Sequence, residues 1–171
     1  MMKKLLQFSI IAAFLAFTAL ALPATNTSTV HAAATSASVQ SPKVAAVSCS
    51  GDNCNGKSPV STGCSATSLV THQVTFSSHG GGYVEFVFSA TCHAAWGFIH
   101  FNTAMPSGHT GDAGIANSTG AGYICSQGGN NEVMPGQHSC YTGMVGDESF
   151  QTARVIGFFD DTVIARTANY W

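Results

Sequence analysis

Charged side chains are scarce in this sequence. Six Lys and Arg and eight Asp and Glu make up only 8% of the 171 residues, against about 25% in an average domain. After residue 32, four basic residues remain against eight acidic ones, which leaves a net charge of −4 with neutral histidines. A nucleic-acid-binding protein needs a basic patch to neutralise phosphates. The composition therefore argues against nucleic acid as a partner.

Long apolar runs are also absent after residue 32, where no stretch approaches the ~20 residues of a membrane span. The one long run, residues 5–22, follows a basic start and precedes the sequence Val30-His31-Ala32. These three residues fit the small-residue cleavage pattern of a signal peptidase. We therefore predict that residues 1–32 are a secretion signal peptide, with an uncleaved membrane anchor as the alternative.

Small, weakly polar residues follow the predicted signal peptide. Residues 33–48 contain a single charged side chain and cannot bury enough apolar area to fold by themselves. We predict that they form a flexible linker rich in Ala, Ser and Thr. Residues 49–171 are then expected to form a single disulfide-bonded domain. We expect this domain to be secreted as a monomer that has no membrane association after signal cleavage.

Helical periodicity is missing as well, because no ten-residue segment after residue 32 carries an apolar stripe with a 3.6-residue period. Short β-branched and aromatic segments predict strands instead, at residues 69–76, 83–88, 96–101, 122–125, 141–145, 151–159 and 162–166. Residues 102–137 are mostly Gly, Ser, Asn, Pro and Ala, which predicts a long loop. The expected fold class is all-β, a small β-sandwich or partly open β-barrel with a Cys-rich N-terminal strap.

Six cysteines occur in the predicted domain, and an even number in a secreted chain predicts three disulfides. Their positions are Cys49, Cys54, Cys64, Cys92, Cys125 and Cys140. A bridge between Cys125 and Cys140 would staple the long loop, so we predict this pair. The other four are expected to fasten the N-terminal segment to the strand that contains Cys92, with their partners left open. No Cys-x-x-Cys pair is present, so we predict no metal site and no cofactor.

Catalytic motifs are absent too, since the sequence has no Gly-x-Ser-x-Gly elbow and no His-x-x-x-His spacing. The leading hypothesis is therefore non-catalytic binding of a cell-wall or environmental glycan, or of an extracellular protein. The residues expected to bind are Tyr83, Glu85, Trp96, Phe98 and His100, whose alternation assigns them to strand faces. A core position beside Cys92 is the alternative for Trp96.

Two other function classes stay open. A small secreted hydrolase would use Glu85 with a nearby histidine such as His100, provided that both lie on one accessible face. A secreted inhibitor or toxin-like effector would act through the loop at 102–137.

Two segments also resemble the bacterial family known as domain of unknown function 2690. The first is CSGDNCNGKSPVSTGC, residues 49–64, and the second is YVEFVFSATCHAAWG, residues 83–97. Matching positions are Cys49, Gly51, Cys54, Gly56, Pro59, Gly63, Cys64, Glu85, Ser89, Cys92, Ala94, Ala95 and Trp96, with a further similarity at residues 141–145. The sequence departs from the family pattern at Ser58, Val87 and Phe88, where the family has an acid, Arg and Tyr. The resemblance implies a secreted or surface-exposed, disulfide-bonded module and brings no known activity.

Overall fold

The computed structural model describes residues 46–148 and 152–170. The predicted signal peptide and residues 33–45 of the predicted linker lie outside the described residues. The described part contains short 3₁₀ helices and β-strands but no α-helix, which confirms the all-β prediction. The elements are η1 (Gly51–Cys54), η2 (Cys64–Thr67), β1 (Ser68–Phe76), β2 (Gly82–Ser89), β3 (Ala94–Phe101), β4 (Gly111–Asn117), β5 (Gly122–Ile124), β6 (Ser139–Tyr141), β7 (Val145–Gly146), β8 (Ala153–Phe159) and β9 (Thr162–Arg166).

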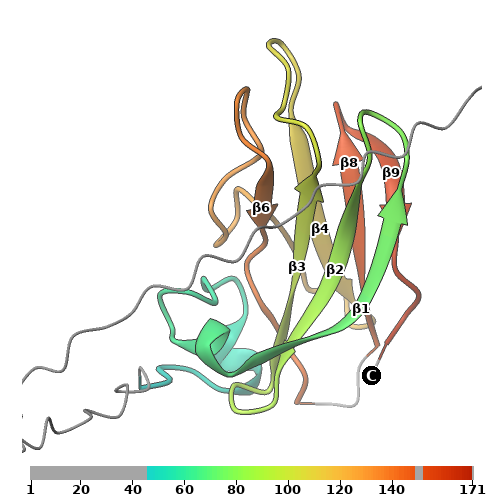
Figure 1. The fold of residues 1–171 in the computed structure, drawn as a ribbon. Coiled ribbons are helices and arrows are strands. Elements are labelled where there is room, and N and C mark those ends of the chain that lie inside the picture. Colours follow the sequence, from blue (N-terminus) through green and yellow to red (C-terminus); the bar gives the residue numbers. More distant parts are fainter. Residues whose placement is uncertain (1–45, 149–151, 171) are drawn as a thin grey trace, which may run out of the picture. The chain divides into compact units, whose positions relative to one another are not determined.

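The strands form two antiparallel sheets, which do not close into a barrel (Figure 1). The first sheet has the order β1-β2-β3-β6, and β7 pairs with the start of β3. The second sheet has the order β5-β4-β8-β9. The architecture is therefore a sandwich, the first of the two forms that the sequence predicts.

Apolar side chains from both sheets fill the space between them. Residues alternate along each strand, so every second side chain points into the core. The first sheet contributes Val84, Phe86, Ile99 and Phe101, and the second contributes Ala113, Ile115, Val155 and Phe159. Gly157 allows close contact between the sheets, because a Cβ there would lie 2.5 Å from Val84 Cγ1 and 2.9 Å from Ile99 Cδ1.

The strand predicted at 122–125 is present as β5, but the prediction of a loop over the rest of 102–137 is wrong, because residues 111–117 form β4. β4 lies inside the second sheet, between β5 and β8. Its glycines make room for aromatic rings: a Cβ at Gly111 would overlap the Phe101 ring, and one at Gly114 would lie 3.3 Å from Phe158 Cε2. Much of the apolar surface that packs around β4 thus belongs to aromatic side chains of other strands. The sequence of β4, which has Gly or Ala at four of its seven positions, therefore predicts a loop.

The predicted strand at 141–145 is interrupted in the structure. β6 ends at Tyr141 and β7 begins at Val145. Between them, the buried Thr142 hydroxyl makes hydrogen bonds in place of part of the regular β-pairing. Its Oγ1 accepts a hydrogen bond from the Gly97 N–H at 3.0 Å and donates one to the Gly143 carbonyl at 2.7 Å. A buried hydroxyl that is fully hydrogen-bonded in this way makes the break tolerable.

All six cysteines are paired in disulfides. Cys125–Cys140 is present, as the sequence predicts, and it joins the end of β5 in the second sheet to β6 in the first. The other bridges are Cys49–Cys54 and Cys64–Cys92. Cys92 lies in the turn between β2 and β3 and not in a strand, and only Cys64 is bonded to it. Three disulfides indicate an oxidising environment outside the cytoplasm.

Residues 46–67, here called the strap, pack at the end of the first sheet where β2 turns into β3 (Figure 1). The Gly51 N–H donates to the Cys92 carbonyl at 2.8 Å, and the Gly56 N–H donates to the Met144 carbonyl at 2.9 Å. Val47 also packs against the buried residues beneath the strap. The last residues of the predicted linker therefore belong to the folded part.

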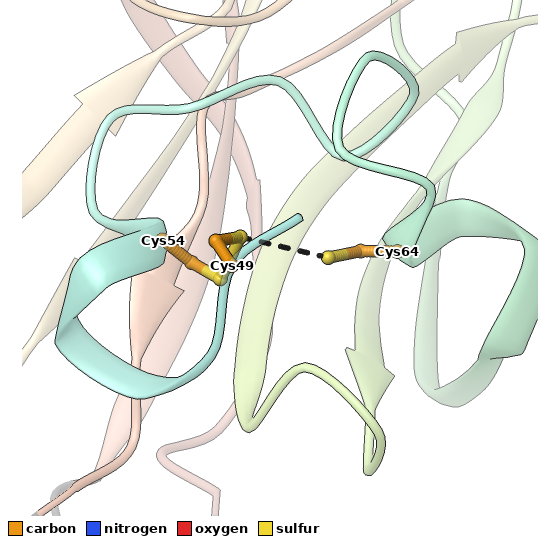
Figure 2. A group of neighbouring side chains, drawn as sticks. All are labelled: Cys49, Cys54 and Cys64. Atoms are coloured by element: carbon orange, nitrogen blue, oxygen red, sulfur yellow. Dashed lines mark hydrogen bonds between the residues drawn. A yellow bond between two sulfur atoms is a disulfide. The ribbon is translucent and has the colours of Figure 1, made fainter. Parts of the chain in front are cut away.

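The Cys49–Cys54 disulfide lies beside Cys64, which is itself bonded to Cys92 (Figure 2). The sulfur atoms of Cys49 and Cys64 lie 3.8 Å apart. Because each of these atoms is already bonded to another sulfur, neither carries a proton, and the contact is one of van der Waals packing. The two bridges thus form one compact sulfur cluster at the centre of the strap.

The turn between β8 and β9 offers a direct stability test. Asp160 and Asp161 have φ values of +45° and +61°. A two-residue hairpin turn with positive φ at both positions favours Gly at the second one. We expect Asp161→Gly to raise the free energy of unfolding by about 0.5 kcal/mol, and Asp161→Ala to lower it. Urea denaturation measures both, and a Gly variant less stable than the Ala variant would contradict the turn assignment.

Candidate functional site

The register of β2 and β3 brings the five predicted binding residues to one face. Tyr83 lies opposite His100, Glu85 opposite Phe98, and Val87 opposite Trp96. These positions alternate with the core residues of the same strands, so all of them point away from the second sheet. The structure therefore groups the predicted residues on the outer face of the first sheet.

Four rings on this face, from Phe98, Tyr83, His100 and His138, form a continuous line that we call the aromatic row. The Tyr83 ring centroid lies 6.2 Å from that of Phe98 and 5.1 Å from that of His100, and His100 stacks on His138 at 5.9 Å. Phe98, Tyr83 and His100 are half-buried and His138 is exposed. Desolvation, followed by the negative charge of Glu85, raises the pKa of the Tyr83 phenol above 10.0. The phenol is therefore neutral and can donate a hydrogen bond.

Trp96 does not belong to the exposed part of this face. Its side chain is only 5% exposed and packs in a second buried cluster with Cys64, Cys92, Val87 and other residues beneath the strap. The strap therefore covers one end of the outer face and leaves the aromatic row open at the other end. Trp96 therefore occupies a core position beside Cys92, the alternative that the sequence analysis gave for it.

A groove of about 230 Å³ lies where the strap meets the open part of the face. Its walls combine strap residues with residues of the sheet: Pro59, Val60, Ser65, Ser68, Glu85, Val87, Trp96, Phe98 and Tyr141. Among these nine lining residues, Glu85 is the one charged side chain. Phe98 belongs both to the groove and to the aromatic row, so the two form one continuous surface.

Glu85 is held in place by a neighbour on the edge strand. The Gln73 Nε2 donates a hydrogen bond of 2.8 Å to Glu85 Oε1. His100 lies on the same face but pairs with Tyr83 across the strands and stacks on its ring. Glu85 and His100 share an accessible face, as a hydrolase would need, but the structure shows no hydrogen bond between their side chains.

A second polar cluster, which the sequence analysis missed, lies at the loop end of the sandwich. His109 Nδ1 hydrogen-bonds Asp160 Oδ2, and the Thr110 N–H donates to Asp160 Oδ1 at 2.9 Å. The Thr110 N–H and then the His109 side chain hold the pKa of Asp160 below 3.8. His79 and His109 both pack against the Phe159 ring. The three loops that supply these residues are distant in sequence, and no spacing motif announces the cluster.

Among residues 46–148 and 152–170, two groups of side chains have the proximity expected of metal ligands, and both contain cysteines. One comprises Cys49, Cys54 and Cys64, and the other comprises Asp112, Cys125 and Cys140. Metal binding by cysteine requires a thiolate, and all of these cysteines are in disulfides. Neither group therefore offers a thiolate ligand set in the oxidised protein.

Asp112 is a half-buried carboxylate beside the Cys125–Cys140 disulfide. Its Oδ1 accepts hydrogen bonds from the Ala113 N–H at 2.7 Å and the Cys125 N–H at 3.0 Å. Desolvation nevertheless raises the pKa of Asp112 above 3.8. The folded state consequently binds more protons than the unfolded state between these two pKa values, so stability falls as pH rises through that range.

Asp112→Asn tests this linkage. The amide keeps the Oδ1 acceptor but carries no charge, so we expect the variant to be more stable than the wild type at neutral pH. Well below pH 3.8 the wild-type carboxyl is protonated in both the folded and the unfolded state, so the difference should disappear there. Urea denaturation at neutral and acidic pH measures it. A variant that is less stable at neutral pH would show that the hydrogen bonds outweigh desolvation.

Comparisons with known proteins cover most of this domain. A family model described as Protein of unknown function (DUF2690) matches residues 52–156, more than half of the chain. The chain is also similar to the uncharacterized protein YjfA of Bacillus subtilis (strain 168), with 37% identity over 124 residues that cover 68% of this chain and 79% of YjfA. No solved structure matches the chain. The family match includes the strands that carry the aromatic row and most of the groove.

Proposed function

The chain belongs to the DUF2690 family of proteins of unknown function, and from this premise we propose that it is a secreted, non-catalytic module that binds an extracellular glycan. The aromatic row and the groove form the binding surface. Secretion is supported by the signal-like residues 1–32 and by the three disulfides, which persist in oxidising compartments. The described residues contain no helix that could cross a bilayer.

One observation carries the proposal: aromatic rings line up on an open sheet face that is nearly free of charge. Phe98, Tyr83 and His100 offer apolar contact to the C–H surfaces of sugar rings, while the neutral Tyr83 phenol offers a hydrogen-bond donor. Gln73 and Glu85 add an amide and a carboxylate beside the row. This combination of apolar surface and a few oriented polar groups is typical of small-ligand sites.

Co-sedimentation with insoluble chitin, cellulose and peptidoglycan tests the proposal. The oxidised domain is expected to sediment with at least one polymer, and Tyr83→Ala should weaken this binding about tenfold because it removes one stacking contact and one donor. Leu69→Ala is the matched control, since Leu69 is 73% exposed on β1 and lies outside the aromatic row. Trp96→Ala is less suitable, because it would create a cavity in the core.

Binding that Tyr83→Ala and Leu69→Ala reduce equally would overturn the assignment of the aromatic row. No binding to any polymer would overturn the glycan proposal. A protein partner would then be the next candidate, with the loops that flank β4 and β5 within residues 102–137 as the surface that an inhibitor or effector would use.

A small secreted hydrolase is the second candidate function, and the His109–Asp160 pair favours it. A carboxylate that holds one imidazole nitrogen leaves the other free to act as a general base. This pair is a better acid–base arrangement than Glu85 with His100, because Glu85 is bonded to Gln73 instead. Hydrolysis of model esters or glycosides that His109→Ala abolishes would support an enzyme. Activity that His109→Ala leaves unchanged would exclude this pair.

A further inference from the structure

We infer that the groove is the subsite for an acetamido group, so that the ligand of the aromatic row is a polymer of N-acetylated hexosamines. This inference rests on the proposed glycan-binding function and specifies its ligand class. The inference assigns a role to the groove, to which the proposed function of the aromatic row gives no separate role. The shared chemistry covers two sources, chitin-type polymers and the glycan strands of bacterial cell walls.

The walls of the groove fit a small apolar group. Pro59 and Val60 face the groove from the strap, and Val87, Trp96 and Phe98 face it from the sheet. A sugar hydroxyl placed against these five side chains, away from the hydroxyl groups of Ser65, Ser68 and Tyr141 in the same groove, would lose its hydrogen bonds to water without replacing them, which costs about 1–3 kcal/mol. A methyl group would instead gain from the same contacts. The groove therefore disfavours an unsubstituted sugar hydroxyl at this position and favours an acetyl methyl.

Glu85 supplies the polar half of the same subsite. Its Oε1 accepts the hydrogen bond from Gln73, whereas no donor among residues 46–148 and 152–170 reaches its Oε2. A carboxylate oxygen accepts a hydrogen bond from an N–H or an O–H donor, but a sugar O–H can turn towards water instead. The N–H of an acetamido group has a fixed direction once its methyl group fills the groove, so it needs the Glu85 oxygen at the border as its acceptor. An acetamido group carries that N–H directly beside its methyl group. The negative charge of Glu85 also disfavours an anionic group inside the groove itself through like-charge repulsion.

The aromatic row would bind the rest of the polymer. Phe98 lines the groove and also stands 6.2 Å from Tyr83, so a sugar whose acetamido group enters the groove would place its neighbours along the row. Contacts along the row are made to the sugar rings themselves and do not distinguish N-acetylated from unsubstituted sugars. Affinity is thus assigned to the row, and discrimination to Glu85 and the groove.

The test compares chitohexaose with cellohexaose, which share a β-1,4 backbone and differ by an acetamido group in place of one hydroxyl on each sugar. Titration calorimetry on the oxidised domain is expected to show about tenfold tighter binding of chitohexaose, the combined value of burying an acetyl methyl group and fixing its N–H on Glu85. Glu85→Ala should remove most of this preference. Tyr83→Ala is the matched control, and it should weaken both ligands by the same factor and leave the preference intact.

Each result has a defined meaning. Equal binding of the two hexasaccharides would overturn the acetamido subsite but leave the proposed glycan-binding function standing. A preference that survives Glu85→Ala would also overturn the subsite. Purified peptidoglycan glycan strands form a third arm, which tells the two sources apart. Failure of all three ligands to bind would overturn both the subsite and the proposed function. Because Glu85 is half-buried on the outer face, a circular dichroism melt suffices to show that the variant is folded.

Discussion

Removal of the Cys64–Cys92 disulfide, in a Cys64→Ser/Cys92→Ser double variant, is expected to lower the free energy of unfolding by about 3.5 kcal/mol. The bridge closes a loop with a sequence separation of 28, and the loss of chain entropy in the unfolded state grows with the logarithm of this separation. The same bridge ties the strap to the turn after β2. We therefore expect the variant to lose the strap wall of the groove, and with it the proposed discrimination between sugars.

The other two bridges provide the controls. The same entropy relation gives about 3 kcal/mol for Cys125–Cys140, with a separation of 15, and about 2 kcal/mol for Cys49–Cys54, with a separation of 5. Guanidinium denaturation of the three double variants measures this order. A Cys49/Cys54 variant destabilised as much as the Cys64/Cys92 variant would show that packing of the sulfur cluster, and not loop closure, dominates the strap.

Ile99→Ala should lower the free energy of unfolding by about 3 kcal/mol, because it leaves a cavity in the middle of the sandwich. Ile99 is fully buried in β3, and it meets the second sheet at Gly157, where no side chain is available to fill the space. The neighbouring strands are held by their ladders and can collapse only partly into the cavity. The expected cost is therefore well above that of an exposed substitution.

The conservative variant Ile99→Val is the control for this cavity, and its expected cost is about 1 kcal/mol. Urea denaturation monitored by tyrosine and tryptophan fluorescence gives both values. The outcome that would contradict this account is an Ile99→Ala variant no less stable than Ile99→Val. That result would mean that the two sheets can approach each other to fill the cavity, and that the contact at Gly157 does not fix the distance between them.

The first sheet could be predicted from the sequence because its strands alternate strongly. The pattern Val84, Phe86 and Phe88 assigns one face to the core, and two of these residues are among the fully or nearly fully buried side chains. That assignment also placed Tyr83 and Glu85 on the outer face together. Strand register then brings Phe98 and His100 opposite them, which alternation alone could suggest but not fix.

The second sheet was harder to predict because β4 has little apolar character of its own. Its small residues pack against aromatic rings from Phe101 and Phe158, so the apolar pattern resides in other strands. The His109–Asp160 pair was missed for a related reason. It joins the loop before β4 to the turn after β8, and the sequence separation of 51 residues leaves no local motif to detect. The groove depends likewise on where the strap packs on the first sheet. The sequence did not determine this position, because it left the partners of Cys49, Cys54, Cys64 and Cys92 open.

The order of the three disulfides along the chain also governs how the domain responds to mechanical tension. A pull on the two ends of the described chain follows a covalent path through Cys49–Cys54, then Cys64–Cys92, then Cys125–Cys140. Residues 65–91, which include β1 and β2, lie inside the second of these loops and bear none of the load. When the rest of the chain is stretched, these residues therefore stay out of the extended length, and only a reducing agent would add them to it.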